Sequence, residues 1–419
     1  MANRVEPDTL RSGCAAPICA KMEKMLQEEA ANPLSVFDSI QRTDNEPKLR
    51  AESRFTYLNR SGTVAAGRMR NQIDLWYAEH PADDRYELRQ RLRSGDEHGF
   101  DSAFQELVLN ALARALGCKL CSHPDLPGTS KHPDFVVRSE EHGLAYMEAV
   151  SASEVSRKAE GAENRTATLL DGLDRLETDD FFVGTTIRQR GTQAPSARRL
   201  RSSVDGILRS LEPTELAAKL HGGGLSELPR FPITLDDWVL DLTVMPKSKP
   251  GGRLIGIEMT GVQEIDTTSP LRAALKRKAG RYGELDSPYV IAINTNDMFA
   301  EQEDVITALY GTETLQVTSS ADGHTTVVPS RVRDGLWLCE DGPQNTRVSA
   351  VMFTRHLTPA NLMLKADARL YLNPWASRPY FGELGRLDTV VLAENSISVR
   401  PGRALREVLK LDLSWPGWD

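Results

Sequence analysis

The chain has 419 residues, of which 40% are hydrophobic and 26% charged, and its formal net charge is −8. These values are typical of a soluble globular protein with two or three lobes, and they exclude a surface that is basic all over and binds nucleic acid indiscriminately. No apolar run is long enough to span a membrane, and the N-terminus lacks a signal-peptide pattern, which predicts a cytoplasmic protein.

The first 99 residues are rich in helix formers and predict an N-terminal helical region. Residues 71–79 and 86–94 form amphipathic patterns on either side of His80-Pro81, where a helix should end because proline restricts the residue before it.

The next stretch, residues 100–151, predicts a helix followed by strands and turns. Gly117 marks the end of the helix, and the loop that follows is rich in proline and glycine. The expected elements are a helix over 100–117 and strands over 118–124, 135–137 and 144–150.

Three acids in that stretch are candidate site residues. Glu106 is on the helix, Asp134 comes directly after Pro133 at a strand start, and Glu148 is near the end of the next strand. Two carboxylates at the ends of neighbouring strands can share Mg²⁺ or Mn²⁺ through oxygen ligands. Glu148 stands inside an apolar run, where a carboxylate is costly unless it is paired or bound to metal. A surface position for Glu106 and a plain strand-start role for Asp134 remain alternatives.

Residues 152–268 predict an insertion of helices and strands, with a second acidic pair, Asp241 and Glu258, as a weaker rival site. Three glycines at 222–224 suggest a flexible break. The expected elements are a helix over 154–176, a strand over 181–187, helices over 196–211 and 213–221, and a strand pair over 238–244 and 253–259 joined by a turn.

A helix over 271–282 and a buried strand over 288–294 come next, with Pro270 suited to the first turn of the helix and Gly283 to its end. Residues 296–419 predict a β-rich region that packs on the core sheet. Its expected elements are a helix over 304–310 and strands near 325–328, 348–353 and 369–372.

The segments SAFQELVLNALARALG, PGTSKHPDF, the EA dipeptide at Glu148-Ala149 and KAGRYGELDSPYVIAIN together resemble the PD-(D/E)XK nuclease superfamily. The resemblance implies an α/β fold with a restriction-endonuclease-like αβββαβ core, formed by residues 100–151 and 269–295. It also implies a metal-dependent DNA endonuclease of a bacterial restriction or antiphage defence system, with a possible protein partner. Asp134 and Glu148 would bind Mg²⁺ or Mn²⁺, and Glu106 would be the helix-borne acid.

The motif's lysine is missing, because its place two residues after Glu148 is taken by Val150. A lysine from elsewhere must then offset charge on the scissile phosphate. Lys278 is the first candidate, since it follows Leu275 by three residues and Leu271 by seven and therefore lies near the buried face of its helix. The other candidates are Lys276, Lys131 and Lys158. The alternative is a catalytically inactive nuclease-fold module that binds nucleic acid or a partner protein.

Cys118 and Cys121 could form half of a zinc site with Cys14 and Cys19, although the segment also fits a core strand in which cysteine packs as a small apolar residue. Two basic runs, at 198–201 and 276–281, could line a nucleic-acid groove or be solvated helix faces.

Overall fold

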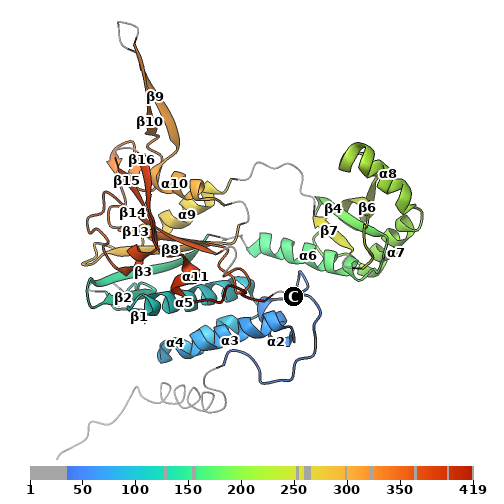
Figure 1. Ribbon diagram of the computed structural model, residues 1–419, viewed down its shortest axis with the longest axis horizontal. Helices are drawn as coiled ribbons and strands as arrows, with labels where there is room; N and C mark the ends of the chain where they lie inside the picture. Colours follow the sequence, from blue (N-terminus) through green and yellow to red (C-terminus); the bar gives the residue numbers. More distant parts are fainter. Residues whose placement is uncertain are drawn as a thin grey trace, which may run out of the picture.

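The computed structural model of the chain describes residues 35–126, 130–152, 157–251, 254–258, 266–297, 300–319, 324–362, 366–393 and 396–417, with only the backbone for 157–160 and 256–258. Figure 1 shows a large lobe built around one sheet and a smaller lobe, coloured green, beside it. The predicted α/β class is confirmed, because the large lobe is a mixed sheet with helices on both faces.

The large sheet has eight strands in the order β1-β2-β3-β8-β13-β14-β15-β16. The first three strands are antiparallel neighbours, and β8 lies parallel to β3 on one side and to β13 on the other. All of β8 is buried, as its apolar sequence predicts. The strands are β1 (Lys119–Ser122), β2 (Phe135–Ser139), β3 (Gly143–Ser151), β8 (Tyr289–Thr295), β13 (Ala350–Arg355), β14 (Asp367–Leu372), β15 (Asp388–Ala393) and β16 (Ser396–Arg400).

Helix α5 (Glu97–Ala115) covers one face of this sheet, and α9 (Thr268–Ala279) and α10 (Gln302–Tyr310) cover the other. The Asp96 side chain caps α5 by accepting the backbone N–H groups of the first turn. The buried amide of Gln105 fixes α5 to the sheet, because it donates to carbonyls of both β3 and β8. The helices predicted over 100–117 and 304–310 are therefore present.

The N-terminal helices pack on the outer side of α5 (Figure 1). The predicted break at His80-Pro81 is confirmed, since one helix ends just before it and the next begins just after it. These helices are α2 (Arg54–Arg60), α3 (Val64–Ala78) and α4 (Ala82–Arg93).

The smaller lobe lies between β3 and α9 in the chain and has an apolar core of its own. Its four-stranded sheet has the order β5-β6-β4-β7. The main-chain N–H groups of Arg50 and Ala51 donate to the Asp171 carboxylate, which joins this lobe to the N-terminal segment. Its elements are α6 (Arg157–Asp174), β4 (Phe181–Gln189), α7 (Ala197–Leu208), α8 (Pro213–Gly223), the 3₁₀ turn η1 (Gly224–Glu227), β5 (Arg230–Leu235), β6 (Trp238–Pro246) and β7 (Ile255–Glu258).

Two details predicted for this lobe are wrong. The strands β6 and β7 do not pair with each other, because β5 and β4 occupy the two edges of β6 and β7 pairs in parallel with β4. The strand β5 was not predicted because it contains Pro232, a residue that edge strands tolerate. The glycines at 222–224 are no break either, since α8 continues through Gly223 and ends at Gly224, whose φ of +73° suits glycine.

The C-terminal strands extend the large sheet instead of packing on it, because β13 adds to the free edge of β8. The hairpin β9–β10 projects from this lobe at the top of Figure 1. None of the described helices is both long and apolar enough to cross a membrane. The remaining elements are β9 (Glu313–Ser319), β10 (Thr325–Arg331), β11 (Leu338–Cys339), β12 (Gly342–Pro343), the 3₁₀ turn η2 (Glu383–Arg386) and α11 (Leu405–Val408).

Candidate functional site

Asp134 and Glu148 come from neighbouring antiparallel strands and face the same side of the large sheet. The register pairs Phe135 with Met147, so Asp134, one residue earlier, lies opposite Glu148. Side chains alternate along a strand, and Tyr146, two residues before Glu148, belongs to the apolar cluster under α9. Both acids therefore face α9.

The carboxylate of Glu148 is fully buried and bonded on both oxygens. Its Oε1 accepts from the Lys278 ammonium and from the Arg281 guanidinium, each at 2.6 Å. Its Oε2 accepts from the Tyr282 hydroxyl, also at 2.6 Å. Two cations and a phenol thus stabilise the charge of a carboxylate that could not otherwise be buried.

Lys278 reaches the acids as its helical spacing predicts. Its side chain is 15% exposed, whereas Lys276 on the same helix is open to solvent. Lys131 donates instead to the backbone carbonyl of Arg281, at 2.9 Å. The side chain of Lys158 lies outside the described residues. Among the candidates whose side chains are described, Lys278 is the one that bonds a carboxylate of the pair.

Arg281 and Tyr282 were not predicted as site residues, although Arg281 belongs to the basic run at 276–281. The helix was expected to run to residue 282 but ends at Ala279, with Gly280 as its C-cap, and the turn after it folds both side chains back onto Glu148. Burial and the hydrogen bond to Glu148 raise the pKa of Tyr282 well above its ordinary value, so the phenol stays a donor. The spacing of three and four residues from Lys278 was the available signal.

Asp134 is the less neutralised acid of the pair. Its Oδ2 accepts the Ala149 N–H at 2.8 Å, which ties it to β3. Burial and the nearby charge of Glu148 raise the pKa of Asp134 to about 6, although Lys278 and the Ala149 N–H oppose the shift. At neutral pH the carboxylate is therefore ionised but poorly compensated.

Glu106 lies near the pair, and its charge contributes to the raised pKa of Asp134. Its own carboxylate is engaged by both terminal nitrogens of Arg91 on α4, with Nη1 at 2.6 Å. A bidentate arginine leaves this acid little capacity for another ligand. Glu106 is thus brought close to Asp134, but it has a partner of its own.

The donor set can hold a hard divalent cation. Oδ1 of Asp134 accepts no hydrogen bond from the residues that the structure describes, and burial together with the charge of Glu148 raises the pKa of this carboxyl. Carboxylate oxygens are the ligands that Mg²⁺ and Mn²⁺ prefer. Glu148 could join Asp134 if Arg281, whose side chain is 40% exposed, moves off Oε1. Asp134 and Glu148 therefore fit the expected metal.

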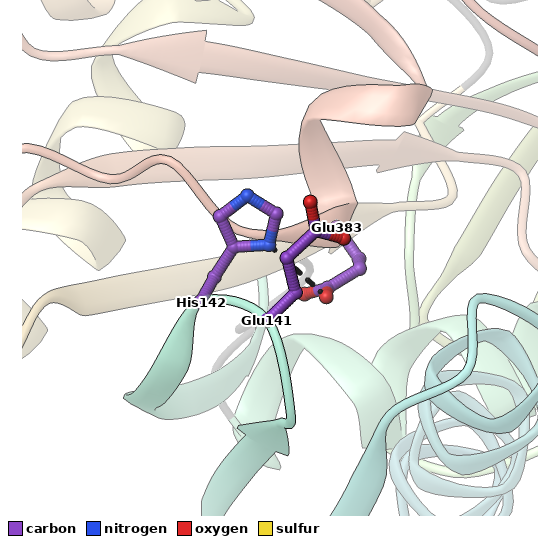
Figure 2. A group of neighbouring side chains, drawn as sticks. All are labelled: Glu141, His142 and Glu383. Atoms are coloured by element: carbon purple, nitrogen blue, oxygen red, sulfur yellow. Dashed lines mark hydrogen bonds and ion pairs between the residues drawn. The ribbon is translucent and has the colours of Figure 1, made fainter.

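A second group with ligand atoms lies at the other end of the β2–β3 hairpin. Figure 2 shows Glu141 and His142 from the hairpin turn facing Glu383 of η2. Glu383 already accepts from the Ser139 hydroxyl, from His142 at 3.2 Å and from the Cys118 thiol at 3.4 Å. These bonds account for the buried carboxylate without an ion, and they fasten η2 to the hairpin.

The rival acidic pair and the zinc site gain little support from the structure. Asp241 pairs with Arg188, and the side chain of Glu258 lies outside the described residues. Cys118 is buried beside Glu383, with a pKa that burial raises to about 12, and Cys14 and Cys19 also lie outside the described residues.

Of the two basic runs, the one at 198–201 lies on α7, where Leu200 is buried in the smaller lobe and Arg199 pairs with Asp236. The run at 276–281 borders the acids through Lys278 and Arg281. Only the second run is therefore near the candidate site.

Replacing Glu148 by glutamine is expected to destabilise the fold by about 3 kcal/mol, because Lys278 and Arg281 would lose the carboxylate that neutralises them. Urea denaturation should show the loss as a lower midpoint. The matched control is Glu106→Gln, whose single partner Arg91 is 32% exposed, and it should cost less than Glu148→Gln because the cation it leaves is partly hydrated. Equal midpoints for the two variants would contradict the special burial of Glu148.

No family model matches the chain, and comparisons with curated proteins and with solved structures likewise found no significant match.

Proposed function

We propose that this protein is a metal-dependent nuclease of the cytoplasm that hydrolyses phosphodiester bonds, in DNA rather than RNA, as part of a restriction or antiphage defence system. The order α5, β1, β2, β3, α9, β8 supports a restriction-endonuclease-like αβββαβ core, with the smaller lobe inserted after the strand that carries Glu148. The defence role rests on the resemblance in the sequence.

One observation carries this proposal: the Lys278 ammonium lies 2.6 Å from Glu148, although it comes from a helix distant in sequence. Asp134 stands opposite on the adjacent strand. Two carboxylates and a lysine therefore meet at one point, which supports Lys278 as the substitute for the lysine missing at Val150.

Each residue has a chemical task in hydrolysis. Water adds its oxygen to phosphorus, the bond to the leaving sugar oxygen breaks, and a proton passes to that oxygen. Lys278 would offset the negative charge that builds on the phosphate. Arg281 is exposed enough to turn from Glu148 toward a phosphate oxygen. Tyr282 and the Ala149 N–H would hold the two carboxylates in place.

The metal, held by Asp134 and Glu148, would supply Lewis-acid stabilisation of the phosphate and would favour the attacking form of water.

A second candidate function is a nuclease-fold module that binds nucleic acid, or a protein of the same system, without cutting it. The observation that favours it is the full set of hydrogen bonds on Glu148, whose two oxygens accept from Lys278, Arg281 and Tyr282. If that arrangement is permanent, Glu148 serves only as the anion of a structural ion pair with Lys278 and Arg281.

Incubation with plasmid DNA decides between the two functions. The nuclease should nick or cut the plasmid with Mg²⁺ or Mn²⁺ and should leave it intact with EDTA. Calorimetry should detect Mn²⁺ binding that Asp134→Asn removes. DNA binding that is the same with EDTA and with Mg²⁺, together with no cleavage and no heat of metal binding, would establish the non-cutting module.

A further inference from the structure

A hollow of about 350 Å³ lies beside the loop that follows α9. Its walls come from three segments: the loop itself, the turn before β13 and the turn after β14. The residues that line it are Glu284, Leu285, Ser287, Thr346, Arg347, Ser377 and Arg378. Two guanidinium groups and three hydroxyls therefore surround one cavity, which is donor chemistry suited to an oxyanion.

Both arginines are fixed by backbone carbonyls of the same loop. Arg347 donates through Nη1 to the carbonyl of Tyr282, and Arg378 donates through Nε to that of Leu285 at 2.7 Å. A guanidinium has five N–H donors, so one bond to a carbonyl holds it in place and leaves donors for a ligand. Arginines that are already oriented lose less entropy when they bind an anion.

The charge of these two arginines is uncompensated. Within the described part of the chain, no carboxylate lies within ion-pair distance of Arg347 or Arg378, in contrast to Arg281 and Arg91. Glu284 is the one acid that lines the hollow, and like Arg347 and Arg378 it is exposed to solvent. The hollow therefore carries a net positive charge next to a loop that bears Arg281.

Tyr282 connects the hollow to the acids. Its carbonyl accepts from Arg347, while its hydroxyl donates to Glu148. Only the length of one tyrosine thus separates the hollow from the candidate active site.

We propose that the hollow between Arg347 and Arg378 binds a backbone phosphate of the nucleic acid next to the phosphate that is cut. This proposal rests on the proposed function, since it assigns the strand a path from the acids past Tyr282. Contacts of this kind set the register of a strand without reading its sequence. The affinity gained through the hollow should therefore be the same for every sequence.

The test measures binding of a short fluorescein-labelled DNA duplex by anisotropy in EDTA, where cleavage cannot interfere. The variant is Arg347→Gln with Arg378→Gln, because a glutamine amide can still donate to a loop carbonyl. It should weaken binding equally for unrelated sequences, and the slope of log K against log salt should become shallower by about 0.9. Glu284→Gln should act in the opposite direction and tighten binding.

The control is Arg199→Gln with Arg209→Gln on the smaller lobe, which changes the net charge equally but removes arginines that are paired with aspartates. Melting temperatures should confirm that each variant is folded. If the two double variants shift affinity and slope alike, the effect is one of overall charge and the hollow is not a phosphate site, while the nuclease proposal stands.

Two further outcomes would also overturn the site. In the first, inorganic phosphate binds the wild type and loses its affinity in the Arg347→Gln, Arg378→Gln variant while DNA binding stays unchanged, which would assign the hollow to a free anion. In the second, the wild-type protein neither binds nor cuts DNA, which would end the proposed function and the strand path with it.

Discussion

Replacing Asp134 by asparagine should abolish cleavage and at the same time make the protein more stable. Asparagine keeps the shape and can still accept the Ala149 N–H, but it removes the charge that a divalent cation needs. Loss of several kcal/mol of transition-state stabilisation corresponds to a rate at least about 10³-fold lower.

The gain in stability follows from the raised pKa of Asp134, which burial and Glu148 bring to about 6. Between about pH 4, the ordinary pKa of aspartate, and pH 6, the native state binds more protons than the unfolded state. Wild-type stability therefore falls as pH rises through this window. The uncharged amide would escape that loss, and we expect Asp134→Asn to be more stable by about 1–2 kcal/mol above pH 7.

Thermal melting of the two proteins at pH 8 and at pH 4.5 tests this reasoning. The variant should melt a few degrees higher at pH 8, and the difference should shrink at the lower pH, where Asp134 of the wild type is protonated in the fold. A variant that is less stable at pH 8 would show that Asp134 is a stabilising structural acid. A variant that still cuts plasmid would remove Asp134 from the site.

Replacing Lys278 by alanine should slow cleavage on the order of 10²–10³-fold, the usual effect of losing one donor to the transition state. The ammonium also bonds the buried Glu148, so some stability should be lost with it, about 2 kcal/mol. Arg281 remains on the same oxygen and limits that loss. Single-turnover rates with saturating DNA, together with urea midpoints, separate the two effects.

Lys276→Ala is the matched control, because this lysine is on the same helix but is exposed to solvent. It should change neither rate nor midpoint. Lys278→Met keeps the apolar stem without the charge, and it should be as slow as Lys278→Ala. If Lys278→Ala cuts at the parental rate, the lysine is only structural, and Lys131→Ala becomes the next variant to measure.

Local patterns in the sequence were sufficient for most elements of the large lobe. The strands β2 and β3 were predicted from their apolar runs, and in the observed register Asp134 and Glu148 share one face because adjacent strands share a pleat. The apolar spacing of α9 likewise places Lys278 at the edge of its buried face. Such patterns involve residues that lie only a few positions apart in the chain, so the sequence shows them directly.

Other features depend on contacts that no local pattern encodes. The turn after α9, which ends at Ala279, brings Arg281 and Tyr282 onto Glu148, and the sequence alone suggested a longer helix. Pairing of Glu106 with Arg91 required knowledge of how α4 lies against α5. The sequence did not reveal that β7 pairs with β4 and not with β6, because strand pairing depends on which strand edges are free.

Short-range patterns along the chain predict the α/β class of this protein, and the 3.6-residue period of α9 places Lys278 at the edge of its buried face. The choice of Asp134 and Glu148 rested on their positions at strand ends and on the resemblance, and it stays a prediction. Contacts between distant segments bring Lys278 and Arg281 to Glu148 and set Arg347 beside Arg378. Burial of Glu148 requires neutralising partners, and the fold supplies them from a segment more than a hundred residues away, after the inserted lobe.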